Sequence, residues 1–367
     1  MQVHIIAGAR PNFMKIAPII AAITKAQQNG HDISYRLIHT GQHYDKKMSG
    51  DFFEQLGIPE PHANLGAGGG SQAEQTAAIM VGYEKELIGN PADLVLVVGD
   101  VTSTMACSIV AKKLNTKVAH VEAGIRSFDL AMPEEINRMV TDSITDYFFT
   151  TSEVANQNLR YAGIPDERIF FVGNTMIDTL LKQMPGFLKP DFWDEHQLKD
   201  KEYLVVTLHR PSNVDSPEQL KALVDVLENF SGNIPVIFPV HPRTRGNLEK
   251  FGIALDHVKI VEPLGYLQFN YLVRHSLGVI TDSGGITEET TVMGIPCLTL
   301  RDSTERPETI SIGTNVLVGT DPAALKETLR DLVSGNWKKG GIPPLWDGLA
   351  AERIVENLIE LYHLQNV

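Results

Sequence analysis

The sequence is poor in features that would place the protein in an oxidising compartment or in a membrane. Its 367 residues include only two cysteines, Cys107 and Cys297, and both lie in apolar runs. That placement is typical of small buried residues and not of a disulfide pair. No apolar run approaches the length of a membrane-spanning helix. The chain enters a strand-like segment at residue 3 without a basic leader, so we expect a cytoplasmic protein.

A surplus of positive charge is also missing. The sequence has 32 Lys and Arg against 45 Asp and Glu, a net charge of −13, and no stretch of it is densely basic. We therefore expect neither nucleic acid nor a membrane surface as a partner. A phosphate-bearing ligand would have to be bound by local arginines and helix N-termini, because the overall field repels anions.

Short apolar runs and amphipathic segments alternate along the chain. The apolar runs are almost continuous in Val, Ile and Leu, which is typical of parallel sheets covered on both faces. We expect strands at 3–7, 35–40, 94–99, 118–121, 147–151, 170–173, 204–208, 236–240, 258–261, 278–281 and 297–300. We expect helices at 13–28, 50–56, 102–113, 134–144, 153–162, 217–229, 267–275, 286–293 and 323–334.

This alternation predicts an α/β fold with two doubly wound, Rossmann-like parallel-sheet domains, because the length exceeds what one hydrophobic core normally supports. Residues 184–201 are rich in Pro, Asp, Glu and Lys and lack a strand pattern, so we place the linker there. The N-terminal domain is then 1–183 and the C-terminal domain 202–347. The last amphipathic segment, 348–367, has no strand after it, and we expect it to pack back on the first domain.

The unusual polar residues follow the predicted strands, which is where open parallel sheets bind ligands. The loop 8–15 follows the first strand, Gly99 and Asp100 follow the third, and Glu122 ends the fourth. The loop 8–15 is not a GxGxxG motif, and no acidic ribose-binding residue follows the second strand. We therefore expect no nicotinamide cofactor.

Most of these residues also have an ordinary structural interpretation. Asp100 can be a helix N-cap, Glu134 and Arg138 can form a surface ion pair at i,i+4, and a lone His209 is more often structural than catalytic. Glu122 is harder to explain in this way, because it ends a strand flanked by valines. A carboxylate buried there is costly unless it has a partner or a chemical role.

The sequence Asp282-Ser283-Gly284-Gly285 follows a predicted strand and begins a predicted helix. Glycines let the backbone approach an anion, and the first helical turn supplies N–H donors. The alternative is an ordinary helix cap at Ser283. Carboxylates follow strands in one half, and a histidine, arginines and this glycine turn follow strands in the other. That coincidence favours one shared ligand site.

These motifs resemble those of the non-hydrolysing UDP-N-acetylglucosamine 2-epimerases, a family with the two-domain GT-B fold in which two Rossmann-like domains face a cleft. The matching stretches are 8–15, 40–43, 99–100, 121–126, 132–138, 208–210, 282–289 and 304–308. They occur in the family's order and extend over nearly the whole chain.

The resemblance implies reversible conversion of UDP-GlcNAc into UDP-ManNAc without a cofactor or a metal, in the supply of ManNAc-type sugars for surface polysaccharides. The implied steps are removal of the C2 proton with loss of UDP, a bound 2-acetamidoglucal, and re-addition of UDP. Asp100, Glu122 and Glu134 are then the acid/base candidates, and His209 assists at the diphosphate. The implied substrate-binding residues are Arg10, Lys15, Arg138, Phe269, Ser283, Gly284, Gly285, Glu289 and Arg306, with Glu289 at the ribose and Phe269 at the uracil.

The resemblance also implies a homodimer and bears on regulation. Gln42, Arg210 and His241 are candidates for a regulatory site. Many bacterial members bind a second UDP-GlcNAc as an activator through a pair of glutamines. Here Gln42 is kept, but Asp45 occupies the second position. We therefore hypothesise that activation by substrate is altered or absent.

Four alternatives stay open at this point. The first is a 2-epimerase acting on a UDP-2,3-diacetamido-uronic acid, which needs an additional cation for the substrate carboxylate. The second is a hydrolysing epimerase that releases ManNAc. The third is a glycosyltransferase of the same fold, and the fourth is a nucleotide-sugar sensor without catalysis.

Overall fold

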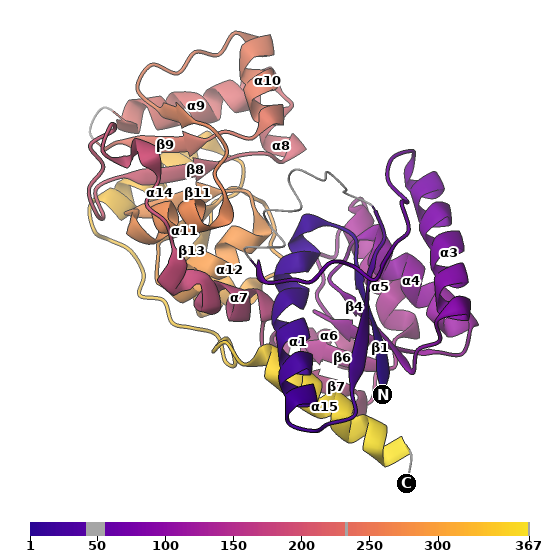
Figure 1. Ribbon diagram of the computed structural model, residues 1–367. Helices are drawn as coiled ribbons and strands as arrows, with labels where there is room; N and C mark the ends of the chain where they lie inside the picture. Colours follow the sequence, from indigo (N-terminus) through magenta and orange to yellow (C-terminus); the bar gives the residue numbers. More distant parts are fainter. Residues whose placement is uncertain (42–55, 232–233, 366–367) are drawn as a thin grey trace. The chain divides into compact units, whose positions relative to one another are not determined.

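The computed structural model describes residues 1–41, 56–231 and 234–365, and for residues 10, 231 and 365 it describes the backbone alone (Figure 1). The chain forms two compact units, Met1–Thr179 with Pro344–Val367, and Leu180–Pro343. Of the expected helix 50–56, only the last residue lies within the described part.

The first unit is built on one parallel sheet. Its strands are β1 (Gln2–Ala7), β2 (Ser34–His39), β3 (Ala63–Asn64), β4 (Leu94–Val98), β5 (Lys117–Val121), β6 (Tyr147–Thr150) and β7 (Ile169–Phe171). They are ordered β3-β2-β1-β4-β5-β6-β7. The helices are α1 (Arg10–Gln28), α3 (Gln72–Gly89), α4 (Thr102–Lys113), α5 (Pro133–Ile144), α6 (Glu153–Tyr161), the 3-10 turn η1 (Asp166–Arg168), α7 (Thr175–Gln183), which extends into the second unit, and α15 (Ala350–Gln365). The strand order reverses between β1 and β4.

The second unit repeats this plan. Its strands are β8 (Leu204–Thr207), β9 (Val236–Pro239), β10 (Lys259–Val261), β11 (Gly278–Thr281), β12 (Cys297–Thr299) and β13 (Asn315–Leu317), in the order β10-β9-β8-β11-β12-β13. Its helices are η2 (Met184–Gly186), η3 (Asp191–Trp193), α8 (Pro211–Val214), α9 (Pro217–Ser231), α10 (Pro242–Phe251), α11 (Tyr266–His275), α12 (Gly284–Met293), α13 (Pro307–Ser311) and α14 (Pro322–Val333). Here the order reverses between β8 and β11.

The predicted fold class of two doubly wound parallel-sheet domains is confirmed, since the strand pairs of both sheets are parallel. The sequence analysis missed β3 and β13, which have two and three residues and are too short to show a pattern. It also missed α3, where the buried side chains Ile79, Tyr83 and Leu87 form a narrow stripe along one face.

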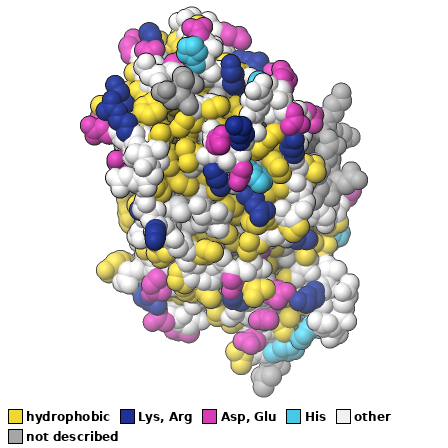
Figure 2. All heavy atoms as spheres, turned by 90° about the vertical axis from the view of Figure 1, so that its left-hand side faces the viewer, with side chains coloured by type: hydrophobic (Ala, Val, Ile, Leu, Met, Phe, Trp, Pro, Cys, Tyr) yellow, Lys and Arg dark blue, Asp and Glu magenta, His cyan; other side chains and the backbone are white. Residues whose placement is uncertain are grey.

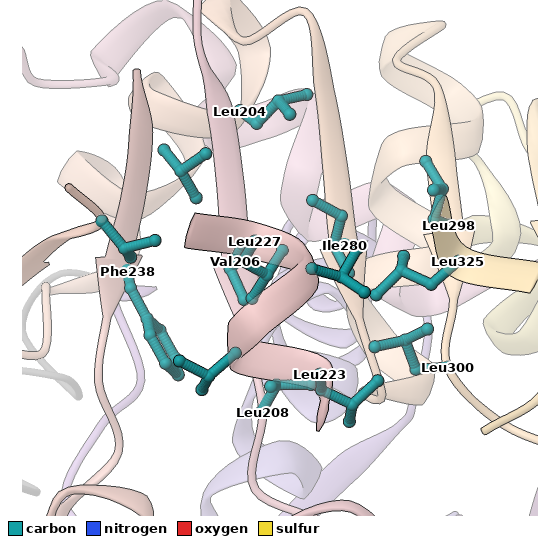
Figure 3. Close-up of a cluster of buried hydrophobic side chains, with 14 of the residues drawn as sticks. Leu204, Val206, Leu208, Leu223, Leu227, Phe238, Ile280, Leu298, Leu300 and Leu325 are labelled. Carbon is teal, nitrogen blue, oxygen red and sulfur yellow. The ribbon is translucent and has the colours of Figure 1, made fainter. Parts of the chain in front are cut away.

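Apolar side chains cover both faces of the second sheet. On one face, Leu204 and Val206 of β8 pack with Ile280 of β11 against α9 and α14, as Figure 3 shows. On the other face, Val205 packs with residues of α11 and with Trp193 of η3. Burial on both faces explains why the strands read as continuous apolar runs.

The C-terminal helix α15 packs on the first unit. The Asp178 carboxylate accepts hydrogen bonds from the N–H groups of Ala350 (3.2 Å) and Ala351 (2.7 Å), the first two residues of the helix. Just before the helix, the Trp346 indole donates to the Thr151 carbonyl at 2.9 Å. The two bonds to Asp178 satisfy helix N–H groups that would otherwise lack partners.

The surface is mixed in character. In the part of the chain that the structure describes, no helix has both the length and the apolar character needed to cross a bilayer. The face drawn in Figure 2 has acidic and basic side chains interspersed among apolar ones. On this face no extended area of one charge is visible.

Two glycines near α15 and α6 provide a matched test of the packing of α15. Gly173 has φ +96°, and a Cβ added there would lie 2.0 Å from the carbonyl oxygen of Leu345, in the segment before α15. Gly163 has φ +84°, and a Cβ there would meet nothing within 4 Å. We expect Gly163→Ala to lower the free energy of unfolding by about 1–2 kcal/mol through backbone strain alone. Gly173→Ala should lower it by clearly more, because the Leu345 peptide must also move.

Urea titrations of both variants would measure the two losses. Equal losses would contradict the close contact between Gly173 and the segment that leads to α15.

Candidate functional site

Both units place predicted site residues beyond the carboxyl ends of strands, next to the point where the strand order reverses. Parallel sheets bind ligands at this position, because the loops on either side of the reversal diverge and leave room between them. In the first unit the residues come from α1, from the loops after β4 and β5, and from α5. In the second unit they come from the loops after β8 and β11, from α12 and from the segment before α13.

Glu122 stands directly after β5 in a strained conformation. Its φ is +69°, which is unusual for a residue with a side chain, and it is only 4% exposed. The Lys15 ammonium of α1 donates to Glu122 Oε2 at 2.7 Å. A Cβ added at Gly99 would lie 3.2 Å from Lys15 Nζ and 3.7 Å from Glu122 Oε2. The ion pair therefore lies against the residue that precedes Asp100.

Asp100 is held by α5. Arg138 donates from Nη2 to the Asp100 carboxylate at 2.5 Å and from Nη1 to Glu135 at 2.9 Å, and the Asn137 amide donates to the Asp100 carbonyl at 2.8 Å. Glu134 is exposed in the first turn of α5. Arg138 thus orients Asp100, a contact that the i,i+4 spacing of Glu134 and Arg138 did not predict.

A buried histidine and a buried aspartate support both carboxylate loops, and the sequence analysis missed them. The imidazole of His120 lies 2.8 Å from the Gly99 carbonyl through Nε2 and 2.7 Å from Asp142 through Nδ1. Asp142 also accepts from the Gly124 N–H (3.1 Å) and pairs with Arg126 (2.6 Å). Burial acts to raise the pKa of Asp142, but His120 and Arg126 hold this pKa below its usual value. The two ring nitrogens of His120 thus link the Gly99 carbonyl to the Asp142 carboxylate.

The loop after β1 is tied to β4 by a buried amide. Asn12 Oδ1 accepts hydrogen bonds from the N–H groups of Gly8 (3.3 Å) and Ala9 (3.1 Å), while its Nδ2 donates to the Val98 carbonyl at 2.9 Å. A Cβ added at Gly8 would lie 2.1 Å from Ser103 Oγ, so only glycine fits this close approach. The side chain of Arg10, the next residue, lies outside the described part of the chain.

In the second unit, the buried carboxylate of Asp282 joins the loops after β8 and β11. It accepts from His209 Nδ1 at 2.7 Å, from the backbone N–H groups of His209 (3.0 Å) and Arg210 (2.9 Å), and from the Asn213 amide (3.1 Å). Burial acts to raise the pKa of Asp282, but the bonds from His209 and the backbone hold this pKa below its usual value. With Nδ1 directed at Asp282, His209 presents Nε2 as the atom that can exchange a proton.

The interpretation of Ser283 as an ordinary helix cap is wrong. Ser283 is the N-cap residue of α12, but its side chain makes no capping hydrogen bond. The N–H groups in the first turn of a helix lack intrahelical partners, and such groups favour a nearby anion. Arg301 Nη1 lies 3.8 Å from the position of a Cβ added at Gly284, which places a cation beside this turn. The Arg306 guanidinium is paired with Glu288 in the second turn of the helix.

A cavity of about 200 Å³ opens beside the start of α12. Its lining consists of Thr207, Leu208, His209, Pro239, His241, Pro263, Leu264, Phe269, Ser283 and Ile286. Burial, together with the neighbouring His209 and Arg243, lowers the pKa of His241, so its imidazole is neutral. A largely apolar cavity suits a flat, uncharged ring such as a nucleobase.

Glu289 lies one turn beyond Ile286 and is 5% exposed. The Tyr266 hydroxyl donates to its Oε1 at 2.8 Å. Burial raises the pKa of the Glu289 carboxyl to about 7, and the charge of Glu288 adds to the rise. The surroundings of Glu289 therefore disfavour its charged form, whereas those of Asp282 favour the charged form.

The structure describes two of the three predicted regulatory residues, Arg210 and His241. Gln42 lies outside the described residues. Arg210 donates from Nε to the Asp282 carbonyl at 3.1 Å, and the His241 ring lies 6.1 Å from the His209 ring, centre to centre. Both therefore border the second-unit site, and a regulatory role stays a prediction.

Comparison with known proteins gives a consistent result. The family model for UDP-N-acetylglucosamine 2-epimerase matches residues 25–359. The UDP-N-acetylglucosamine 2-epimerase of Methanocaldococcus jannaschii is 41% identical, over 98% of this chain and 99% of the relative. The UDP-2,3-diacetamido-2,3-dideoxy-D-glucuronate 2-epimerase of Pseudomonas aeruginosa is 38% identical, over 98% of this chain and 100% of the relative. The crystal structure of the M. jannaschii enzyme in complex with UDP-GlcNAc and UDP superposes with a TM-score of 0.86 at 40% identity, covering 98% of this chain and 100% of that chain.

The raised pKa of Glu289 predicts a pH-dependent effect of Glu289→Gln. At high pH, folding buries the charged Glu289 carboxylate in surroundings that disfavour the charge, and this lowers the free energy of unfolding. This cost is fully present above the folded pKa of about 7 and disappears as the pH falls towards the ordinary value of 4.5. We expect Glu289→Gln to raise the free energy of unfolding by about 3 kcal/mol at pH 8 and by little near pH 4.5.

Denaturant titrations between these two pH values would measure the gain. The exposed Glu327 of α14 provides the control, since Glu327→Gln should change little at any pH. A gain for Glu289→Gln that does not vary with pH would contradict the assignment of the raised pKa to this carboxyl.

Proposed function

The chain belongs to the UDP-N-acetylglucosamine 2-epimerase family, and we propose that it catalyses the reversible C2 epimerisation of UDP-GlcNAc to UDP-ManNAc. The observation that carries the proposal is the arrangement of Asp100 and Glu122 next to Gly99, each paired with a cation. Inversion at a C–H carbon requires one group to remove the proton and another to deliver a proton to the opposite face. A single carboxylate could not serve both faces.

The reaction is an elimination followed by an addition. A carboxylate of the first unit takes the C2 proton, the C–H electron pair forms the C1=C2 double bond, and the C1–O bond to UDP breaks. The products held by the protein are 2-acetamidoglucal and UDP. In the return step an oxygen of the UDP diphosphate attacks C1, and a proton is added to C2 on the other face. Asp100, Glu122 and the exposed Glu134 are the groups proposed to exchange these protons.

The second unit is proposed to bind and stabilise UDP. Negative charge develops on the diphosphate as the C1–O bond breaks, and preorganised donors stabilise such charge. The N–H groups of Gly284 and Gly285, the Ser283 hydroxyl, Arg306 and His209 are the proposed donors. His209 is fixed for this purpose by its bond to Asp282.

Three further substrate contacts complete the proposal. Phe269 lines the cavity beside α12 and would contact the uracil. Glu289 would accept hydrogen bonds from the ribose. Arg10 and Lys15 would contact the phosphates or the sugar, with Lys15 doing so while paired to Glu122. The protein is further proposed to be a cytoplasmic homodimer.

A second candidate function rests on the P. aeruginosa relative. At 38% identity it is almost as similar to this chain as the M. jannaschii enzyme, and its name specifies a UDP-2,3-diacetamido-glucuronate substrate. Such a substrate brings an additional carboxylate at C5 of the sugar. Comparison of kcat/KM for the two UDP-sugars would decide between the candidates, and a higher value for UDP-GlcNAc supports the proposed function.

Incubation with UDP-GlcNAc in deuterated water tests the proposed reaction. We expect UDP-ManNAc that carries deuterium at C2, detected by NMR, because the proton added to C2 comes from a group that exchanges with solvent. Glu122→Gln and Asp100→Asn should each slow this exchange by roughly 100-fold or more, as expected for loss of an acid or base.

Glu84→Gln is a matched control, since Glu84 is an exposed carboxylate on α3 of the same unit. Near-normal exchange in both Glu122→Gln and Asp100→Asn would refute the proposed mechanism. Release of free ManNAc would identify a hydrolysing enzyme. Incorporation of the sugar into an added acceptor would identify a glycosyltransferase, and binding without any exchange would identify a sensor.

The replacement of the second regulatory glutamine by Asp45 predicts the form of the kinetics. We expect the initial rate to rise hyperbolically with UDP-GlcNAc concentration, because one half of the proposed activator contact is missing. Sigmoidal kinetics that Gln42→Ala abolishes would contradict this prediction.

A further inference from the structure

The buried carboxylate of Glu289 has an unusual environment for a ligand-binding group. It is 5% exposed, and its nearest charged neighbour in sequence, Glu288, is also a carboxylate and is engaged by Arg306. No cation is paired with Glu289 itself among the described residues. The groups that hold it in place must therefore be neutral hydrogen-bond donors.

Tyr266 is one such donor. It begins α11, and its hydroxyl donates to Glu289 Oε1 at 2.8 Å. Burial raises the pKa of the Tyr266 hydroxyl far above its ordinary value, so this group keeps its proton and acts as a donor at any physiological pH. The bond fixes one oxygen of the Glu289 carboxylate.

Asn270 lies one turn further along α11 and is completely buried. Within the described part of the chain, neither its side-chain oxygen nor its nitrogen has a hydrogen-bond partner. Asn270 follows Tyr266 at i+4 and therefore lies on the same face of α11, and its amide acts to lower the pKa of the Glu289 carboxyl. A buried amide without a partner is rare and costly, which indicates that a bound ligand or a small adjustment of Glu289 completes its bonding.

We propose that Tyr266 and Asn270 are positioning residues that hold Glu289 as the acceptor for the vicinal diol of the nucleotide's ribose, and that they thereby make the site selective for ribonucleotides. The inference rests on the proposed function in one respect, namely that Glu289 contacts the ribose. A vicinal diol supplies two hydroxyl donors on one side of the sugar, and a carboxylate oxygen in a fixed orientation accepts from such a pair. A 2′-deoxynucleotide lacks one of these two donors.

Affinities of UDP and 2′-deoxy-UDP, measured by titration calorimetry, test the proposal through a thermodynamic cycle. The unmodified protein should bind UDP about tenfold or more tightly than 2′-deoxy-UDP, since a hydrogen bond to a charged group is worth that factor. Tyr266→Phe should reduce this preference to about threefold or less, mainly by weakening the binding of UDP. Asn270→Leu, which replaces the amide with an apolar side chain of similar size, should reduce it in the same direction.

Tyr271→Phe is the matched control. It removes a hydroxyl from the same helix, but the Tyr271 ring packs against Trp193 and His275, and no hydrogen bond joins it to Glu289 among the described residues. We expect this variant to keep the full preference for UDP. If Tyr266→Phe lowered the affinities for UDP and 2′-deoxy-UDP by the same factor, the effect would be generally structural and the proposal would be overturned.

The same titrations separate failure of this inference from failure of the proposed ribose contact. If Glu289→Gln loses the preference while Tyr266→Phe and Asn270→Leu keep it, Glu289 binds the ribose without their help and the inference alone is wrong. If the unmodified protein shows no preference for UDP, or if Glu289→Gln keeps it, the ribose contact itself is wrong and the inference fails with it. Deuterium exchange at C2 would still report on the proposed reaction in either case.

Discussion

A buried polar side chain bridges the loops at the reversal point of each sheet, and the geometry of both half-sites depends on these bridges. In the second unit, the Asp282 carboxylate accepts hydrogen bonds from the N–H groups of His209 and Arg210 and orients the His209 ring. In the first unit, Asn12 Oδ1 accepts hydrogen bonds from N–H groups of the loop after β1, and its Nδ2 donates to the Val98 carbonyl at the end of β4. Parallel strands leave such N–H groups without ladder partners at their ends. Loss of either bridge would leave several of them buried and unsatisfied, at a cost of roughly 1–3 kcal/mol each.

The carboxylates proposed as acid and base, Glu122 and Asp100, lie next to these loops, and their positions are energetically costly. Glu122 adopts a backbone conformation that side chains rarely occupy, and it depends on Lys15 for charge compensation. Asp100 depends on Arg138, and the carbonyl of the residue before it, Gly99, contacts the His120 ring. Strained backbone and buried ion pairs of this kind persist where chemistry requires a group at a fixed position. In the proposed mechanism the two units have separate roles: the first holds the groups that move protons, and the second holds the leaving group.

Much of this arrangement could be predicted from the sequence, because it follows from local pattern. The apolar runs predicted the long strands of both sheets, and the polar residues after them pointed to Asp100, Glu122 and Asp282. Partners distant in sequence could not be predicted. The i,i+4 spacing suggested that Arg138 pairs with Glu134, whereas the structure pairs it with Asp100, 38 residues away. His120 lies within an apolar strand, and Tyr266 begins an ordinary amphipathic helix, so neither carried a sequence signal.

In the proposed reaction the C1–O bond of the substrate breaks while UDP stays bound, and the bond then re-forms. Positional isotope exchange can detect this, with UDP-GlcNAc that carries oxygen-18 in the bridge between C1 and the β-phosphate. We expect the label to move into the non-bridging positions of the β-phosphate, seen by phosphorus NMR, at a rate no slower than epimerisation. Epimerisation with the label kept entirely in the bridge would refute the elimination, because the C1–O bond would then have remained intact.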